Sequence, residues 1–267
     1  MQAKTLTNDP HGQVDVIILC GGLGSRLADV VSDRPKPMAQ MGRRPFLDIL
    51  IDHFSSFGFR RFVLCTGHRS DCIREHYSRR ADSLEFAISD EPSPLGTAGA
   101  IKNAEASVKS NPFLVANGDS FCPVNLTEFY DFHLAKRAVM SMAVVESGNR
   151  SDAGLVAIDD CQRIVAFEEK GPRRHGRYVN AGIYLFQKEI LSVIPANTKY
   201  SLEYDLFPKL VSEDSFAYIC REPLIDIGTP PRYERAKEYF ACTVDCREAG
   251  SSHNSEAASE YRMDMES

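Results

Sequence analysis

The chain has 267 residues, 43% of them hydrophobic, and this is enough to bury one large core. The formal net charge is −6, but residues 241–267 alone hold six acidic side chains and two arginines, so the rest is close to neutral. This balance argues against nucleic acid or an anionic membrane surface as the main partner. No apolar run reaches the roughly 18 residues that a membrane helix needs, and residues 1–15 lack the apolar core of a secretory signal. We therefore expect a soluble, cytoplasmic protein without a membrane or nucleic-acid partner.

The first predicted element is a buried strand, because residues 14–20 form an apolar, β-branched run that ends at a cluster of glycines. Helical and extended patterns then alternate along the chain. Helices are predicted at 46–57, 69–77 and 97–108, and strands at 62–66, 84–88 and 112–116. Strands separated by helices predict an α/β fold with a mixed, mainly parallel sheet and helices on both faces. Ligands bind such sheets beyond the carboxyl ends of the strands.

The second half of the chain contains several extended segments with few helices between them. These segments lie at 139–145, 155–158, 164–168 and 178–186, and they predict a small antiparallel extension of the sheet. Later elements are predicted at 201–210 (helix), 224–227 (strand) and 231–240 (helix). We expect a flexible N-terminal extension at 1–13, one folded domain at 14–240 and a disordered acidic tail at 241–267.

A glycine-rich loop directly follows the first predicted strand. It reads Leu19-Cys20-Gly21-Gly22-Leu23-Gly24-Ser25-Arg26-Leu27 and is predicted to open a helix. Glycines let the backbone turn sharply and bring its N–H groups against a phosphate, and Arg26 would add a cation. The loop is not a Walker A motif, and Arg26 replaces the third glycine of the dinucleotide fingerprint. A tight turn without a ligand is the alternative interpretation.

The next segment, Arg34-Pro35-Lys36-Pro37-Met38, places a lysine between two prolines. Prolines exclude a regular helix and favour an extended backbone. A rigid Lys36 shortly after a glycine loop is suited to bind a triphosphate. The alternative is an ordinary surface loop with a solvated lysine.

Together with later segments, GGLGSRL and RPKPM resemble the motifs of the sugar-1-phosphate nucleotidyltransferase family. The later segments are Glu91-Pro92, Leu95-Gly96-Thr97-Ala98-Gly99-Ala100, Asn117-Gly118-Asp119, Phe167-Glu168-Glu169-Lys170, Val179-Asn180-Ala181-Gly182-Ile183-Tyr184 and Asp226-Ile227-Gly228-Thr229-Pro230. The resemblance spans residues 16–240. It implies the Rossmann-like fold of nucleotide-diphospho-sugar transferases. It also implies that a nucleoside triphosphate and a sugar 1-phosphate give a nucleotide sugar and pyrophosphate, with Mg²⁺ as cofactor.

The resemblance also implies roles for individual residues. Those expected to bind the nucleotide are Leu19, Gly21, Gly22, Gly24, Arg26, Lys36, Glu91, Gly96, Thr97, Gly118 and Asp119. Those expected to bind the sugar phosphate are Gly154, Glu169, Lys170 and Asn180. The expected catalytic residues are Arg26, Lys36, Asp119 and Lys170. For Glu169 and Lys170, an exposed charge pair at the end of a strand is the alternative.

Asp119 and Asp226 are the candidate metal ligands. Each lies at the end of a predicted strand and next to or near a glycine, so both could reach one edge of the sheet. Magnesium prefers hard oxygen ligands, commonly one or two carboxylates together with phosphates and water. Either aspartate alone would be better explained as a turn residue.

The nucleotide base and the sugar are less directly indicated. A carboxylate only accepts hydrogen bonds, and guanine offers two adjacent donors, so Glu91 favours GTP over a pyrimidine nucleotide. Segments 30–39 and 201–208 resemble guanylyltransferases that act on D-glycero-α-D-manno-heptose 1-phosphate and serve bacterial surface-polysaccharide synthesis. Mannose 1-phosphate guanylyltransferase and N-acetylmuramate 1-phosphate uridylyltransferase are alternatives. A non-catalytic nucleotide-sugar sensor and a nicotinamide oxidoreductase are rivals from other classes, and a homodimer is one option for the open oligomeric state.

Overall fold

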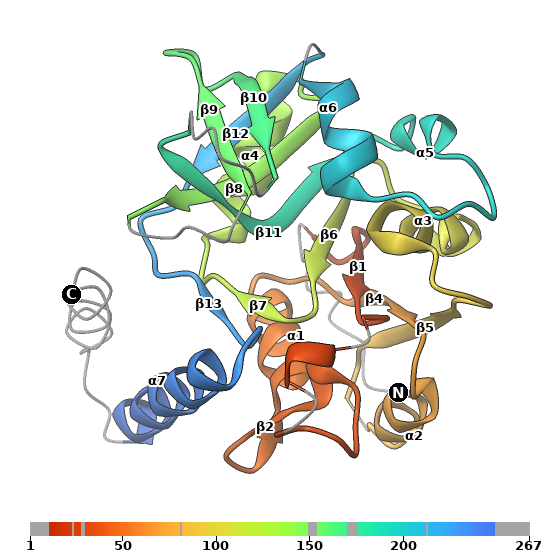
Figure 1. Ribbon diagram of the computed structural model, residues 1–267, viewed down its shortest axis with the longest axis vertical. Coiled ribbons are helices and arrows are strands. Elements are labelled where there is room, and N and C mark those ends of the chain that lie inside the picture. Colours follow the sequence, from red (N-terminus) through yellow and green to blue (C-terminus); the bar gives the residue numbers. More distant parts are fainter. Residues whose placement is uncertain are drawn as a thin grey trace, which may run out of the picture.

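The fold is centred on a nine-stranded mixed sheet (Figure 1). The computed structural model describes residues 11–22, 24–27, 30–80, 82–148, 154–169, 176–211 and 213–248. The main path of the sheet has the order β10-β9-β11-β6-β1-β4-β5, with β8 and β12 attached beside β11. Its N-terminal half is parallel: β1 lies between β4 and β6, and β4 pairs with β5. These strands are β1 (Asp15–Leu19), β4 (Arg61–Thr66), β5 (Glu85–Asp90) and β6 (Phe113–Asn117).

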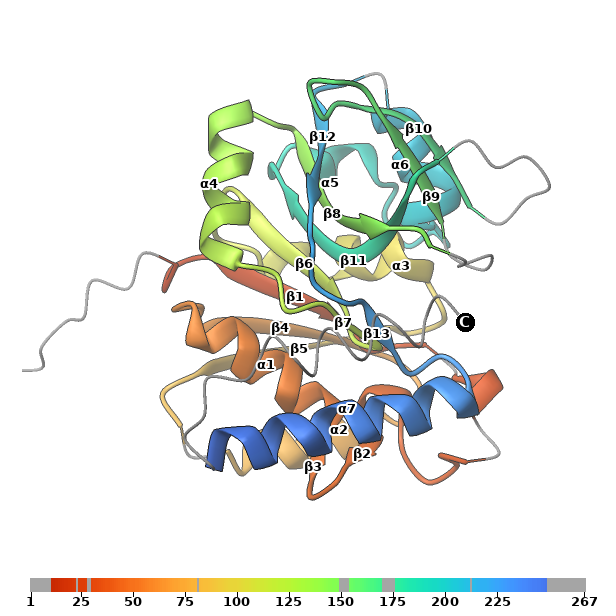
Figure 2. The ribbon, with the colours of Figure 1, turned by 90° about the vertical axis from the view of Figure 1, so that its left-hand side faces the viewer.

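Helices cover both faces of this parallel half, as predicted (Figure 2). On one face lie α1 (Phe46–Ser56), α2 (Ser70–Ser78) and α7 (Pro230–Glu248); on the other lies α3 (Gly96–Asn103). Side chains of β1 alternate between two buried layers: Val16 and Ile18 belong to one layer and Ile17 to the other. Each is fully buried, and burial of such a side chain stabilises the fold by about 1.5–3 kcal/mol. Because successive side chains of a strand point to opposite faces, β1 is buried on both faces of the sheet, as the sequence predicted.

The second half forms the predicted antiparallel extension. β11 (Tyr178–Phe186) pairs antiparallel with β8 (Met140–Glu146) along one side, and on the other with β6 and then β9 (Leu155–Ile158). β10 (Ile164–Glu168) completes that edge, while β12 (Ser215–Ile219) lies parallel to β8. The register of β11 shifts between Asn180 and Tyr184, where Gly182 has a φ of +76°. This irregularity turns β11 from the parallel half into the extension.

Several elements differ from the prediction. Helix α4 (Leu126–Lys136) was missed, and so were β12 and α5 (Ile190–Val193). The segment predicted as one helix at 201–210 is a π-helical turn, Leu202–Leu206, followed by α6 (Phe207–Leu210). Helix α3 ends at Asn103, and a separate 3₁₀ turn (Glu105–Ser107) replaces the rest of the helix predicted at 97–108.

Two small sheets and the chain ends complete the structure. The hairpin β2 (Gln40–Met41) and β3 (Arg44–Pro45) precedes α1, and β7 (Ser120–Phe121) pairs with β13 (Ile225–Asp226). Packing begins before the predicted domain start at 14, because His11 is 2% exposed and stacks on Phe59. Helix α7 also continues to Glu248, past the predicted end of the domain at 240. No helix in the described parts of the chain is long and apolar enough to cross a membrane.

Candidate active site

The glycine loop leaves the carboxyl end of β1 and is crowded by other backbone and side-chain groups. A Cβ on Gly21 would lie 2.3 Å from Glu91 Oε1, and a Cβ on Gly24, whose φ is +60°, would lie 3.3 Å from Lys36 Cβ. The loop therefore touches two other predicted nucleotide-binding residues. It does not lead into the predicted helix within the described residues: a 3₁₀ turn, Ser25–Leu27, follows instead, with Arg26 exposed. Within the described residues, the phosphate binding predicted for this loop therefore has no contribution from the N-terminus of an α-helix.

Lys36 begins a short buried turn. Pro35 is extended, as the sequence predicted, but Lys36–Met38 forms a 3₁₀ turn, closed by a 2.8 Å hydrogen bond from Met38 N to the Pro35 carbonyl. Pro37 and Met38 are buried and anchor the segment. The side chain of Lys36 is only 11% exposed, and its Nζ lies 2.6 Å from Asp119 Oδ2. Lys36 is therefore not a solvated surface lysine.

Gly118 permits the close approach of three segments. Its N–H donates to the Leu19 carbonyl at 3.0 Å, joining the end of β6 to the end of β1. A Cβ at this position would lie 2.6 Å from the Leu19 oxygen and 3.1 Å from Pro37 Cγ. Only a residue without a side chain fits here, and its position directs the following Asp119 toward Lys36.

Asp226 is brought beside Asp119 by the pairing of β7 with β13. Asp226 lies opposite Ser120 in this antiparallel pair, and Ile227 N donates to the Asp119 carbonyl at 3.0 Å. Asp226 Oδ1 accepts hydrogen bonds from Gly228 N at 3.0 Å and from the Arg232 guanidinium at 3.3 Å. The structure therefore places the two candidate metal ligands side by side, Asp119 immediately before β7 and Asp226 in β13. Arg232, in the first turn of α7, was not among the predicted site residues.

The chemistry of this group fits a hard divalent cation. A Cβ on Gly228 would lie 3.0 Å from Asp226 Oδ1 and 3.7 Å from Lys36 Nζ, so the two acids and the ammonium surround one small region. Across the described segments, no three or more His, Cys, Asp or Glu side chains form a cluster that could hold a metal alone. Two carboxylates completed by phosphates and water are nevertheless a typical ligand set for Mg²⁺.

Glu91 lies at the start of the glycine loop and has a structural role there. Its backbone N–H donates to the Thr66 carbonyl, and its Oε2 accepts a 2.7 Å hydrogen bond from Leu95 N. Oε1 is the oxygen that approaches Gly21. Burial raises the pKa of the Glu91 carboxyl, although the hydrogen bond from Leu95 acts in the opposite direction. The side chain thus caps the 91–95 turn beside the loop.

Gly96 and Thr97 contact another part of the protein. A Cβ on Gly96, whose φ is +75°, would lie 2.8 Å from the Tyr200 carbonyl oxygen. Thr97 Oγ1 donates to Glu203 Oε2 at 2.9 Å and accepts from Leu202 N at 2.7 Å. The N–H groups of residues 98 and 99 also donate to the Tyr200 carbonyl. These contacts dock α3 onto the π-helical turn, a role that the sequence did not indicate; binding of nucleotide by Gly96 and Thr97 stays a prediction.

Three of the four predicted sugar-binding residues lie together. The Gly154 carbonyl accepts from Asn180 N at 3.1 Å, and a Cβ on Gly154 would lie 2.7 Å from Glu169 Oε2. The Asn180 side chain is held at both ends: Oδ1 accepts from Gly182 N at 2.8 Å, and Nδ2 donates to the Tyr184 hydroxyl at 2.7 Å. The fourth residue, Lys170, lies outside the described residues.

Gly182 connects this cluster to the carboxylates. A Cβ on Gly182 would lie 2.7 Å from Ser120 Oγ and 2.8 Å from Asn117 Nδ2, and these two residues flank the Gly118-Asp119 turn. The predicted sugar and metal positions are therefore neighbours. Asn117, although part of the motif in the sequence, and Ser120 were not singled out as site residues.

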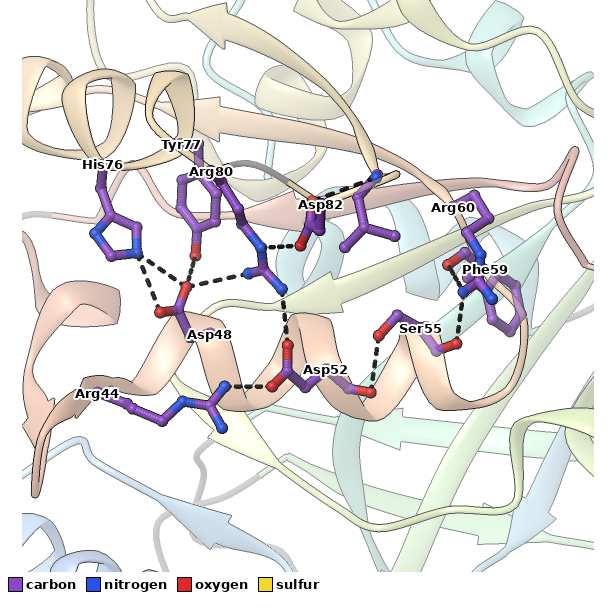
Figure 3. A network of polar contacts seen from close by, with 11 residues as sticks. Arg44, Asp48, Asp52, Ser55, Phe59, Arg60, His76, Tyr77, Arg80 and Asp82 are labelled. Carbon is purple, nitrogen blue, oxygen red and sulfur yellow. Dashed lines mark hydrogen bonds and ion pairs between the residues drawn. The ribbon is translucent and has the colours of Figure 1, made fainter.

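A second charged cluster lies between α1 and the segment that begins with α2 (Figure 3). Asp48 on α1 accepts from Tyr77 at 2.8 Å and from His76 at 3.1 Å, and Arg80 bridges Asp48 to Asp52. These contacts join α1 to α2 and line part of a cavity of about 610 Å³ that includes none of the predicted site residues. The cluster is explained by helix packing.

Comparisons with known proteins agree with the geometry. The nucleotidyl transferase family model matches residues 15–241. The chain is 32% identical over 226 residues to D-glycero-α-D-manno-heptose 1-phosphate guanylyltransferase of Aneurinibacillus thermoaerophilus, covering 84% of this chain and 97% of that protein. It is 30% identical over 227 residues to mannose-1-phosphate guanylyltransferase of Mycobacterium tuberculosis, covering 84% of this chain and 63% of that protein.

Solved structures show the same fold. HddC from Yersinia pseudotuberculosis, crystallised with GMP-PN, superposes with a TM-score of 0.75 at 32% identity, covering 85% of this chain and 99% of that one. A UDP-glucose pyrophosphorylase complexed with UDP-glucose has a TM-score of 0.74 at 17% identity and covers 86% of this chain and 99% of that one. The second likeness concerns the fold alone. The predicted Rossmann-like architecture with a mixed, mainly parallel sheet is confirmed.

Proposed function

Because this chain belongs to the nucleotidyl transferase family, we propose that it transfers GMP from GTP to a sugar 1-phosphate and releases pyrophosphate. D-glycero-α-D-manno-heptose 1-phosphate is the proposed acceptor, so the product is GDP-heptose. The observation that carries this proposal is the grouping of Lys36, Asp119 and Asp226 beside the glycine loop, at the carboxyl ends of β1 and β6. Identity of 32% with a guanylyltransferase of this specificity supports the choice of substrates.

Charge is the main obstacle to the reaction, because both substrates are anions. Mg²⁺ held by Asp119 and Asp226 would neutralise phosphate charge and orient an in-line displacement. Lys36 and Arg26 would bind the triphosphate and stabilise the departing pyrophosphate. An oxygen of the sugar phosphate would form a bond to the α-phosphorus of GTP. The bond from that phosphorus to the oxygen bridging the α- and β-phosphates would break, and pyrophosphate would leave. The attacking phosphate is already ionised, so no general base is assigned.

The sugar phosphate is proposed to bind beside Gly182. Glu169 would accept hydrogen bonds from sugar hydroxyls, and Lys170 would bind the phosphate. Asn180 is suited to orient the sugar, because its own amide is fixed by Gly182 N and by the buried Tyr184 hydroxyl. Holding the reacting groups in such a fixed arrangement lowers the activation barrier, by about 7–11 kcal/mol at best.

Guanine recognition is assigned to Glu91. Its carboxylate lies at the glycine loop and is already oriented by the hydrogen bond from Leu95 N. Each carboxylate oxygen has two lone pairs, so Oε2 keeps acceptor capacity while it caps the turn. A pyrimidine would place a carbonyl oxygen against this carboxylate, and GTP is therefore the preferred nucleotide.

Mannose-1-phosphate guanylyltransferase is the second candidate within the family. Identity of 30% with the Mycobacterium tuberculosis enzyme favours it, although this chain spans 63% of that protein's length. A non-catalytic sensor of the same fold would not need the cations and acids of the site. Arg26, Lys36, Asp119 and Asp226 are all present in this chain.

Pyrophosphate release tests these candidates together. The protein is incubated with Mg²⁺, each of GTP, UTP, dTTP and ATP, and a panel containing heptose, mannose, glucose and N-acetylmuramate 1-phosphates. We expect turnover with GTP and the heptose phosphate, and its loss in Asp119→Asn. Turnover with mannose 1-phosphate alone would select the second candidate, and binding of a nucleotide sugar without turnover would select the sensor.

A further inference from the structure

Lys36 and Asp119 form an ion pair with each other, although each is also proposed to bind the substrates or their metal ion. The ammonium lies 2.6 Å from Asp119 Oδ2, and the lysine side chain is only 11% exposed. The Gly228 turn, which holds Asp226 Oδ1, borders the same ammonium. Lys36 Nζ thus contacts one candidate metal ligand directly and lies beside the turn that follows the other.

The segment around Lys36 keeps the ammonium in this place. The lysine stem packs against Gly24, and the 3₁₀ turn with buried Pro37 and Met38 restricts its backbone. The lysine is largely removed from water but Asp119 is 42% exposed, so the pair is screened less than a fully exposed ion pair and more than a buried one. The Lys36–Asp119 contact is therefore held by the surrounding backbone and packing.

We propose that Lys36 competes with the divalent cation for Asp119, so that the cation binds together with the nucleoside triphosphate and not before it. Mg²⁺ approaches a carboxylate oxygen to about 2.0–2.1 Å, which leaves no room for an ammonium on the same side of that oxygen. Two positive charges in this partly buried region also repel each other. Triphosphate oxygens offer the ammonium another partner and release Asp119 for the cation. This inference rests on the proposed function for the identity of Asp119 as a metal ligand.

Binding of Mn²⁺ to the protein without nucleotide tests the competition. The free ion is followed by electron paramagnetic resonance during titration of wild type, Lys36→Met and Lys36→Arg. We expect Lys36→Met to bind Mn²⁺ at least about tenfold more tightly than wild type, because the competing cation is gone. Lys36→Arg keeps the charge and should bind Mn²⁺ as weakly as wild type. Equal affinity of Lys36→Met and wild type would overturn the proposal.

Controls assign the effect to this pair. Lys102 is a similarly covered lysine, 17% exposed, which pairs with Glu105. Lys102→Met should leave the Mn²⁺ affinity unchanged, and a gain there equal to that of Lys36→Met would count against the proposal. Asp119→Asn in the Lys36→Met background should remove the gain. In wild type, GTP should tighten Mn²⁺ binding beyond the affinity of Mn²⁺ for GTP alone, an arm that needs no variant to fold.

The titration also separates this inference from the proposed function. A gain in Lys36→Met that disappears with Asp119→Asn supports the competition even if no sugar phosphate gives pyrophosphate. Turnover in the pyrophosphate assay without any gain in Lys36→Met would retain the transferase and reject the competition.

Discussion

Replacement of Gly118 by alanine perturbs the point where three segments of the site meet. The added Cβ would lie 2.6 Å from the Leu19 oxygen, 3.1 Å from Pro37 Cγ and 3.3 Å from Cys20 Sγ. The oxygen is the least able to move, because the Leu19 carbonyl accepts the hydrogen bond from Gly118 N and β1 is paired on both sides. The strain should therefore shift the 118–119 turn and separate Asp119 from Lys36.

Overpacking of this kind costs about 1–3 kcal/mol, and each kcal/mol lowers the Tm of a domain of this size by about 2–4 °C. We therefore expect Gly118→Ala to lower the Tm by roughly 2–12 °C in differential scanning calorimetry. Turnover should fall about a hundredfold, because a displacement of 1 Å in a reacting arrangement has that effect.

Gly22→Ala is the matched control for stability. A Cβ on Gly22 meets no atom within 4 Å, so its Tm should equal that of wild type. Activity is not compared for this variant, because Gly22 belongs to the proposed phosphate loop. Equal Tm values for Gly118→Ala and wild type would refute the packing argument. A lower Tm with normal turnover would refute the link between this turn and the site.

Three further predictions concern other parts of the molecule. Arg232→Gln removes a positive charge 3.3 Å from Asp226 Oδ1, so it should lower the Mg²⁺ concentration for half-maximal activity about tenfold, with kcat at saturating Mg²⁺ retained, whereas the exposed Arg235→Gln should match wild type. Burial lowers the pKa of His133 from 6.5 to about 4. Between pH 6.5 and 4 the unfolded chain therefore binds a proton at this histidine that the folded chain does not bind. The free energy of unfolding, measured with urea, should fall by up to about 3 kcal/mol over this range, and His133→Asn should lose this contribution to the pH dependence. Glu91→Gln keeps an acceptor for Leu95 N and should lower the GTP-over-UTP preference about ten- to hundredfold; unchanged discrimination would exclude Glu91 from base recognition.

The pairing of Asp119 with Asp226 could be predicted from the sequence because both residues lie at the ends of strands. β1 and β6 are adjacent and parallel, so the residues after them emerge at one edge of the sheet. Asp226 reaches the same edge through a two-residue strand pair, β7 with β13. The sequence could not specify that Lys36 Nζ contacts Asp119, since this depends on the space left by Gly118 and Gly24.

Helix α4 was missed because its apolar stripe is weak. Only Leu126, Phe129 and His133 are buried, and the histidine reads as polar although it packs in the core and bonds to Ser141. A local signal did exist: Asn125 is an N-cap residue whose Oδ1 accepts from Glu128 N, and its side-chain amide donates to the Glu128 carboxylate. The segment 201–210 was predicted as one helix, whereas the structure has a π-helical turn followed by α6. The sequence could not indicate this, because a π-helical turn has no hydrophobic period that distinguishes it from an α-helix.

The contacts of Thr97 show why a motif identifies a residue without specifying its partner. The sequence associates Thr97 with the glycines around it and hence with a nucleotide. In the structure its hydroxyl joins Leu202 N and Glu203, more than a hundred positions later. The same segment supplies the Tyr200 carbonyl that meets the first N–H groups of α3. Because α3 follows the turn that Glu91 caps, the 200–206 segment supports the residue that we propose recognises the base. A change there should alter nucleotide selection through Glu91 without touching the nucleotide.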